Sequence, residues 1–309
     1  MEAIDRAILE LFDAHDQRGL ARAISRAESG AAAELMRAVH VRTGRAITVG
    51  LTGPPGVGKS TLAAALVRTA RSTGRRVGVV SVDPSSPFSK GAILGDRIRL
   101  SEHFDDSGVF IRSMASRGHL GGLAGATADA VSFMDAFGQD VIFIETVGVG
   151  QSEIEIAELA DTTIVVLQPG SGDAVQMLKA GILEIADIFV VNKSDHPMAL
   201  ALQRDLRAMM EMASFGGWVP PLVATQASQG EGVGALWEAI VAHDAYLRES
   251  GELARRRAGA FAHRVRMLVL GDLENRVDRE IASELASDRG AHEDPYAVAA
   301  AIRAHLAAD

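Results

Sequence analysis

Residues 47–61 read ITVGLTGPPGVGKST. Ile47–Leu51 is a short apolar run that is typical of a buried strand, and a helical pattern begins at Leu62. Between them, GPPGVGKST matches G-x-x-x-x-G-K-[ST], in which glycines let backbone N–H groups turn inward around phosphate oxygens. The amino terminus of the following helix adds the positive end of its dipole. The stretch therefore predicts a strand, a phosphate-binding loop and a helix in succession.

Each residue of this loop is a candidate contact to a bound nucleotide. The Lys59 ammonium is expected to reach the β- and γ-phosphates and to act in catalysis, and the Ser60 hydroxyl is expected to bind Mg²⁺. The alternative is a glycine turn with a purely structural role, which the strand before it and the helix after it disfavour. The predicted contacts are Gly53, Pro54, Pro55, Gly56, Val57, Gly58, Lys59, Ser60 and Thr61.

Six further short apolar runs follow, separated by helical stretches. Runs this short and this apolar suit strands that are buried on both faces, as in a parallel sheet covered by helices. Strands that alternate with helices indicate a doubly wound α/β fold. We therefore predict a mostly parallel sheet built from Ile47–Leu51, Val77–Val82, Val109–Ile111, Val141–Ile144, Thr163–Leu167, Ile188–Val191 and Leu222–Ala224.

The two ends of the chain lack such runs and are predicted to be helical. In residues 1–44 apolar side chains recur at helical spacing, with Gly19 expected to break the first helix and Gly44 to close the segment. A long helix is expected over Glu252–Ala286, followed by a last helix that starts at Pro295. Asp294 is its predicted N-cap.

The predicted helices at both ends and the alternating strands and helices between them divide the chain into three domains. Residues 1–44 form a helical extension, residues 45–245 form the nucleotide-binding domain, and residues 246–309 form a helical carboxy-terminal arm. The arm is too long and too apolar to stay solvated on every side. It is expected either to pack against the same chain or to form a dimer, and the pattern leaves both open.

Composition limits the classes of function. The chain has 309 residues, a net charge of −9 and no cysteine. The acidic balance argues against a general nucleic-acid binder and against binding to an anionic membrane surface. The lack of cysteine excludes a disulfide framework and a thiolate metal site. With no signal-peptide pattern and no run of about 18 apolar residues, a soluble cytoplasmic protein is expected.

A candidate base-binding motif, NKSD, follows the run Ile188–Val191. Asn-Lys-x-Asp after a strand is the guanine reader of GTPases, and here it is Asn192, Lys193 and Asp195. The Asp195 carboxylate can accept from N1–H and N2–H₂ of guanine, whereas adenine would leave it unpaired. Lys193 would lie along the face of the base. The alternative is a surface turn that caps a helix. A third contact, backbone donation to guanine O6, is expected from the loop Gln226, Ala227 and Ser228.

The stretch VIFIETVGVG, residues 141–150, ends a strand in a carboxylate and continues into a glycine loop. Glu145 stands where GTPases place an acid that binds Mg²⁺ through water, and the N–H of Gly148 is expected to sense the γ-phosphate. A dinucleotide-binding turn would need a third glycine where Glu153 stands. We therefore interpret the loop as the moving part of a nucleotide switch.

Two further acids are candidate metal ligands. Asp83 ends the run Val77–Val82, which is expected to lie beside the phosphate-loop strand because consecutive strands of such folds are usually neighbours. An N-cap on the next turn is the alternative for Asp83. Asp96 lies in the glycine-flanked loop GAILGDRIRL. It is a candidate to position the attacking water or to join the Mg²⁺ ligands, and a solvated loop acid is the alternative.

Several stretches of this chain resemble the MeaB/ArgK group of P-loop GTPases, which are G-protein chaperones of adenosylcobalamin-dependent acyl-CoA mutases. The stretches are GPPGVGKST, SVDPSSPFSKGAILGDRIRL, FIRSMASRGHLGGLA, ETVGVGQSEIEIAELAD and GSGDAVQMLKAGILEIADIFVVNKSD. The likeness is clearest over residues 45–245, and ETVGVGQSE is more specific to the group than the phosphate loop is. The resemblance implies a GTP- and Mg²⁺-dependent switch that gates cofactor loading and the protection or reactivation of the mutase.

The resemblance also implies roles for single residues and partners. It gives the phosphate and metal roles to Lys59, Ser60, Asp83, Asp96 and Glu145. Residues 172–179 match a third switch loop that relays the nucleotide state to the mutase, with Lys179 as its candidate catalytic residue. The helical carboxy-terminal extension would form a homodimer. The implied partners are an adenosylcobalamin-dependent acyl-CoA mutase and the adenosyltransferase that supplies its cofactor.

The predicted reaction is attack of water on the γ-phosphate, with Mg²⁺, Lys59 and the loop amides stabilising the developing charge. No glutamine directly follows Gly148, where Ras-type enzymes orient the water, so a slow intrinsic rate is expected. Gln151 lies three positions on, and it contacts either the attacking water or the partner. Arg112 could neutralise charge, but a structural or partner-facing role is favoured for it.

Two other functions are compatible with a phosphate loop. A GTPase that delivers nickel or another metal needs transferable ligands, but the chain has no cysteine and its nine histidines form no His-x-His or His-x₃-His pair. A nucleotide-dependent kinase or transport ATPase is disfavoured by the guanine-type motif Asn192–Asp195. Equilibrium metal binding would distinguish a metal-delivery GTPase from the predicted switch. Comparing GTP with ATP binding would distinguish a kinase or transport ATPase from it.

Overall fold

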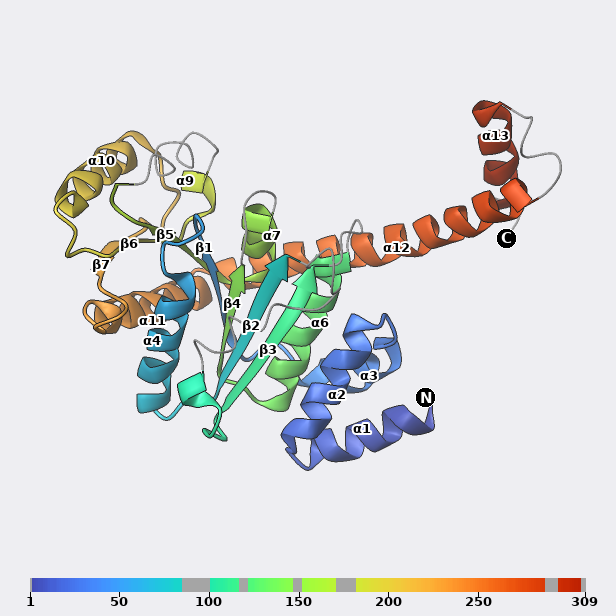
Figure 1. The fold of residues 1–309 in the computed structure, drawn as a ribbon, viewed down its shortest axis with the longest axis horizontal. Helices are drawn as coiled ribbons and strands as arrows, with labels where there is room; N and C mark the ends of the chain where they lie inside the picture. Colours follow the sequence, from blue (N-terminus) through green and yellow to red (C-terminus); the bar gives the residue numbers. More distant parts are fainter. Residues whose placement is uncertain are drawn as a thin grey trace. The chain divides into compact units, whose positions relative to one another are not determined.

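A computed structural model of the chain describes residues 2–84, 101–116, 122–146, 152–170, 182–286 and 294–306 (Figure 1). Within these ranges, parallel strands form one seven-stranded sheet in the order β3-β2-β4-β1-β5-β6-β7. The predicted α/β sheet is confirmed in all seven runs. The strands are β1 (Ile47–Thr52), β2 (Val77–Pro84), β3 (Val109–Ser116), β4 (Val141–Thr146), β5 (Thr162–Leu167), β6 (Ile188–Asn192) and β7 (Leu222–Thr225).

One expectation about the sheet is wrong. β2 does not lie beside β1, because β4 is inserted between them and pairs with both. After β1 the chain passes through α4 (Lys59–Ser72) to β2, which lies two positions away from β1 in the sheet. The position between them is taken later in the chain by β4. As a result Glu145 of β4 is paired in register with Leu51 of β1 on one side and with Ser81 of β2 on the other.

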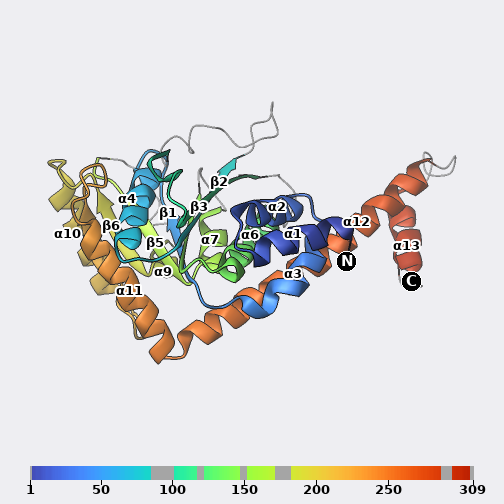
Figure 2. The ribbon, with the colours of Figure 1, turned by 90° about the horizontal axis from the view of Figure 1, so that it is seen from below.

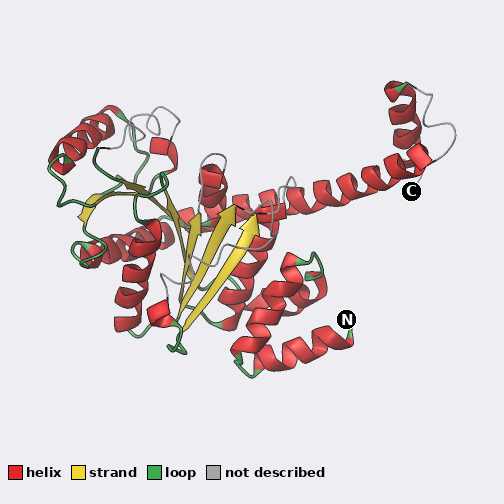
Figure 3. Cartoon of the chain, viewed as in Figure 1, coloured by secondary structure: helices red, strands yellow, loops and turns green. Residues whose placement is uncertain are grey.

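Helices cover both faces of the sheet, as Figures 2 and 3 show. One face carries α4 and α11, and the other carries α6 and α7. Since both faces are covered, strands such as β1, β5 and β6 are buried at every residue. The helices are α4 (Lys59–Ser72), α6 (Gly122–Phe137), α7 (Ser152–Leu159), α9 (Ile182–Ile185), α10 (Ala199–Met212) and α11 (Val233–Glu249), with a 3₁₀ turn at Ser101–His103.

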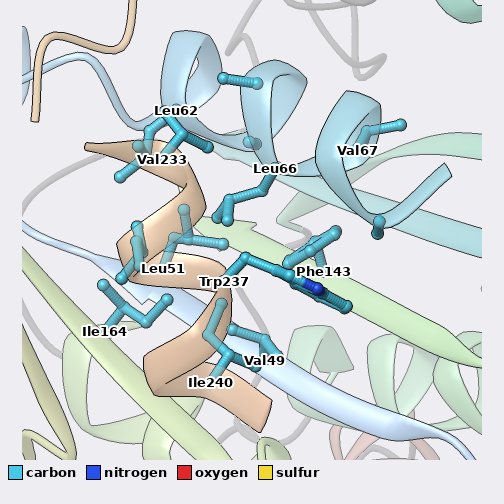
Figure 4. Packing of buried hydrophobic residues seen from close by; sticks show 14 of the residues in the cluster. Val49, Leu51, Leu62, Leu66, Val67, Phe143, Ile164, Val233, Trp237 and Ile240 are labelled. Carbon is cyan, nitrogen blue, oxygen red and sulfur yellow. The ribbon is translucent and has the colours of Figure 1, made fainter. Parts of the chain in front are cut away.

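Figure 4 shows the core on the first of these faces. Leu62 of α4 lies beside Val233 of α11, and Leu66 lies close to Trp237. Phe143 of β4 lies next to Trp237, and Val49 of β1 lies next to Ile240. This packing holds the start of α4 firmly on the sheet, and that start is where the predicted phosphate loop ends.

The amino-terminal residues form α1 (Ala3–Asp13), α2 (Gln17–Glu28), α3 (Ala33–Val39) and a 3₁₀ turn, His40–Arg42. They are helical as predicted, and Phe12 packs edge-on against Phe133 and Phe137 of α6 at ring distances of 6.3 and 5.1 Å. The expectation that Gly19 breaks the first helix is wrong. Gly19 lies inside α2, where a Cβ would come within 2.5 Å of the Phe12 backbone nitrogen. The glycine therefore permits two helices to touch.

The chain divides into two compact units, residues 1–260 and residues 261–309. The predicted carboxy-terminal helices are confirmed as α12 (Glu252–Ala286) and α13 (Pro295–Leu306). The Asp294 carboxylate accepts from the N–H groups of Tyr296 and Ala297, as an N-cap should. Among the described helices, none combines the length and the apolar character that a membrane span requires.

The second unit exposes several large apolar side chains. Phe261, Leu268 and Leu285 are 60, 57 and 64% exposed. Within the same unit, His305 of α13 lies 2.8 Å from the Glu280 carboxylate of α12, and Ile302 is buried. The described part of the unit therefore folds α13 back on α12 and still leaves apolar surface uncovered.

Candidate functional site

The loop of residues 53–58 joins the end of β1 to the start of α4. Gly53, Gly56 and Gly58 all have positive φ, at 144°, 79° and 94°. A Cβ at Gly53 would overlap the carbonyl oxygen of Val166 in β5, and a Cβ at Gly58 would come within 2.5 Å of Asn192 Nδ2. Backbone conformation thus favours glycine at all three positions, and close neighbours on two other strands also require it at Gly53 and Gly58.

The start of α4 is built to receive an anion. Its N-cap is Gly58, which has no side chain to satisfy the free N–H groups of the first turn. Lys59 is 6% exposed, and its Nζ donates to the carbonyl oxygens of Gly53 at 2.5 Å and Pro54 at 3.1 Å. The ammonium therefore lies against the loop itself, where phosphate oxygens are expected.

A hydroxyl in the first turn of α4 and a carboxylate of β4 contact each other next to this loop. Ser60 Oγ donates to Glu145 Oε1 at 2.5 Å, and the two residues are 5% and 1% exposed. Both are hard oxygen donors, the kind that Mg²⁺ selects. Among the described residues no group of three or more His, Cys, Asp or Glu could hold a metal alone. A Mg²⁺ ion that shares nucleotide phosphates needs only one or two protein ligands, so the donor set fits it.

Asn192 ties the predicted base-reading loops to the phosphate loop. It is 3% exposed, and its Nδ2 donates to the carbonyl oxygen of Val57 at 2.7 Å. Its Oδ1 accepts from the Thr225 hydroxyl and from the N–H of Ala227, each at 3.1 Å. One buried amide thus joins the end of β6, the loop after β7 and the phosphate loop. The loops that carry the predicted phosphate and base motifs therefore lie side by side.

Asp195 and its neighbours are presented on the surface of this site. The N–H of Ser194 donates to the carbonyl oxygen of Thr225 at 3.1 Å, which fixes the turn, and Asp195 is exposed. Ala227 is buried and Ser228 is exposed, while Gln226 is held through Glu231. Donation from this loop to guanine O6 stays a prediction.

The comparisons with known proteins agree on one family. The model described as methylmalonyl Co-A mutase-associated GTPase MeaB matches residues 20–282 of this chain. The chain belongs to the MeaB family. A Pyrococcus abyssi protein with a provisional GTPase name is 46% identical over 280 residues, 89% of this chain and 86% of that protein. The mitochondrial methylmalonic aciduria type A homolog of Mus musculus is 37% identical over 216 residues, 68% of this chain and 52% of that protein.

A solved structure shows the same fold. The crystal structure of LAO/AO transport system kinase superposes with a TM-score of 0.72 and covers 99% of this chain and 98% of that one. Its sequence identity is 24%, so the likeness concerns the fold. Membership of the MeaB family implies that the P-loop site binds a guanine nucleotide.

Several predicted residues of this MeaB-family chain cannot be located in the site. Asp96, Gly148, Gln151 and Lys179 lie outside the described residues. Asp83 is described in its backbone alone, as the next-to-last residue of β2 paired with Ala115. Their roles stay predictions.

Arg112 is located, and it has a structural role. Its guanidinium forms an ion pair with Glu28 of α2 and donates to the Ser25 hydroxyl at 3.0 Å. It therefore joins β3 to the amino-terminal helices. This is the structural alternative that the sequence left open.

An ionic cluster that none of the sequence predictions includes lies at the amino-terminal ends of β5 and β6. Arg257 of α12 forms two hydrogen bonds with the Asp161 carboxylate, at 3.0 and 2.7 Å, and donates to the Ala46 carbonyl oxygen at 2.9 Å. Arg256 forms two hydrogen bonds with Asp187, at 2.9 and 2.8 Å. The hydrogen bond with Asp161 raises the pKa of Arg257 above its usual value. The first turns of α12 are thus fixed to the sheet.

A buried histidine completes this cluster. His243 of α11 is fully buried, with Nδ1 2.9 Å from the Thr162 hydroxyl and Nε2 3.3 Å from Asp187. Burial lowers the pKa of His243 below 6.5, and the Asp187 charge opposes part of that effect. The sequence does contain a signal. Glu-Leu-Ala-Asp precedes β5 and Glu-Ile-Ala-Asp precedes β6, which places the two acids at matching positions.

Proposed function

We propose that this chain binds GTP with Mg²⁺ and hydrolyses it slowly, as a molecular switch. The observation that carries the proposal is the Asn192 side chain, which bonds at once to the phosphate loop, to Thr225 and to Ala227. A nucleotide bound by the phosphate loop and by the loops after β6 and β7 would be contacted at its phosphates and at its base at the same time. The exposed carboxylate of Asp195 is then the group that selects guanine over adenine.

The residues of the chain would divide the work of hydrolysis between them. Mg²⁺ would be held by the Ser60 hydroxyl and, through water, by Glu145, and it supplies positive charge to the β- and γ-phosphates. The Lys59 ammonium and the N–H groups of the first turn of α4 would stabilise charge on the phosphate oxygens as water attacks. The sequence has no glutamine directly after Gly148, where Ras-type enzymes orient the attacking water, and this favours a low intrinsic rate.

We further propose that the switch acts on an adenosylcobalamin-dependent acyl-CoA mutase, gating the loading of its cofactor and its protection or reactivation. The description of the family as mutase-associated supports this partner. The adenosyltransferase that supplies the cofactor is a second proposed partner. Residues 45–245 would form the switch, and residues 246–309 would form the homodimer arm, for which the exposed Phe261, Leu268 and Leu285 are suited.

Nucleotide binding by the purified chain tests the first step. Titration with fluorescent GTP and ATP analogues in the presence of Mg²⁺ should show tight binding of the guanine nucleotide and weak binding of the adenine one. Equal affinity for both would contradict the proposal and would favour a kinase or transport ATPase. Tight, stoichiometric binding of Ni²⁺ to the nucleotide-free protein would instead favour metal delivery.

A further inference from the structure

The ammonium of Lys193 is held by acceptors from two different loops. Its Nζ donates to the carbonyl oxygen of Gly56 at 2.9 Å and to Oε1 of Gln168 at 2.6 Å. Gly56 belongs to the phosphate loop, and Gln168 is the first residue after β5. Lys193 also has a left-handed backbone, with φ of 56°, which few residues other than glycine adopt. Both the backbone and the far end of this side chain are therefore fixed.

Gln168 follows β5, a strand that contacts the phosphate loop and also pairs with β6, the strand that leads into the predicted base-binding motif. Leu167, the last residue of β5, is 1% exposed and pairs in register with Val191 of β6. Gln168, the next residue after Leu167, therefore lies at the same height along the sheet as Asn192, the next residue after Val191. Two residues earlier, the carbonyl oxygen of Val166 lies against Gly53 of the phosphate loop. The backbone at position 168 is thus fixed next to both the phosphate loop and the predicted base-binding motif.

The contact matters because lysine is a flexible side chain. Lys193 is exposed, and an exposed lysine loses much rotamer freedom when it is held against a ligand. Acceptors at Gly56 and Gln168 fix the ammonium in advance, so the methylene stem is already extended across the site when a base arrives. The amide oxygen of Gln168 achieves this without cancelling the positive charge near the phosphates.

We propose that Gln168 is a positioning residue for the nucleotide base. It orients the stem of Lys193, on which the face of the base is expected to lie, and it takes no part in the chemistry at the γ-phosphate. The inference rests on the guanine-nucleotide binding proposed above. It extends the base-reading machinery to β5, a strand that the Asn-Lys-x-Asp motif does not include.

Substitution of Gln168 by methionine and by glutamate tests the proposal. Q168M removes the acceptor at nearly constant shape, and Q168E keeps an oxygen in its place. Q168M is expected to raise the Kd for GTP and for GDP by a common factor, about three- to tenfold, with kcat unchanged. Q168E keeps an acceptor for Lys193 but adds a negative charge near the phosphates, so its Kd for GTP is expected to lie between those of the wild type and Q168M. Inorganic triphosphate has no base, so its Kd should be the same for Q168M and the wild type.

Two controls separate positioning from a structural effect. Gln17 donates to the carbonyl oxygens of Ser107 and Val109 at the amino-terminal end of β3, whereas the phosphate loop follows the carboxyl end of β1. Q17M therefore loses hydrogen bonds away from the site and should leave the Kd for GTP unchanged. In a K193M background, Q168M should add nothing, because the side chain that it positions is gone. The Kd values would come from displacement of a fluorescent GDP analogue.

The outcomes are distinct. If the wild type binds GTP tightly and Q168M binds it equally well, the inference is wrong while the proposed function stands. If Q168M weakens binding by the same factor in the K193M background, or lowers kcat instead of affinity, Gln168 does not act through Lys193. A wild type that does not prefer GTP to ATP overturns the proposed function and the inference together.

Discussion

Three consecutive arginines at the start of α12 are expected to differ sharply in their effect on stability. Arg255, Arg256 and Arg257 form one charge run in the sequence. Arg255 is 72% exposed and pairs with Glu252 on its own helix, whereas Arg257 is 29% exposed and pairs with Asp161, whose side chain is 7% exposed. Arg257→Ala therefore tests the ionic cluster, and Arg255→Ala is its matched control.

The expected magnitudes follow from burial. Arg257→Ala leaves the Asp161 carboxylate with a long hydrogen bond from the Thr48 N–H, at 3.3 Å. Removing one partner of a buried ion pair costs about 3–5 kcal/mol, and the partial exposure of Arg257 favours the lower end, about 3 kcal/mol. Arg255→Ala breaks a solvated contact and should cost less than about 1 kcal/mol.

Urea unfolding followed by circular dichroism measures both variants. With a slope of about 3 kcal/mol per M, Arg257→Ala should lower the midpoint by about 1 M, and Arg255→Ala by less than a third of that. The double variant Asp161→Asn/Arg257→Ala should recover part of the loss, because it leaves no buried unpaired charge. Equal midpoints for the two single arginine variants would mean that the Arg257–Asp161 pair contributes no more to stability than the exposed Arg255–Glu252 pair.

Three other predictions concern the site and its surroundings. Asp195→Asn turns an acceptor into a group that can donate, so it should bind GTP at least about tenfold more weakly and xanthosine triphosphate better, as measured by competition. Glu145→Gln should raise the Mg²⁺ concentration needed for GTP binding about tenfold, with Mg²⁺-free GDP binding little changed, in a Mg²⁺ titration. The depressed pKa of His243 means that the unfolded chain takes up its proton near pH 6.5 while the folded protein does not. Stability should therefore fall as the pH drops below 6.5, and urea unfolding at pH 7.5 and 5.5 should show a smaller drop for His243→Gln.

The sequence predicts the elements well because their signals are local. Each strand is a short run of apolar residues, and the phosphate loop lies between a run and a helix, so its glycines and Lys59 can be assigned from the sequence alone. The Asn-Lys-x-Asp motif is found for the same reason. The bond between Asn192 and Val57 cannot be foreseen in this way, because the two residues lie 135 positions apart.

What the sequence does not predict depends on long-range packing. β4 lies between β1 and β2, and no local sequence pattern indicates which strands become neighbours in the sheet. Gly19 has the local pattern of a helix breaker, but its small size serves contact with α1. The arginine run gives no local sign of partners outside its own helix, whereas Arg256 and Arg257 have acid partners 69 and 96 positions away.

We propose above that the chain is a GTP switch for an adenosylcobalamin-dependent mutase. Single-turnover GTP hydrolysis, measured with and without purified acyl-CoA mutases of this class, tests it most directly. We expect slow hydrolysis by the chain alone and a rate that one of these mutases raises about tenfold or more, which corresponds to a barrier lowered by about 1.4 kcal/mol or more. Rapid hydrolysis without a partner, or a rate that none of these mutases changes, would contradict it.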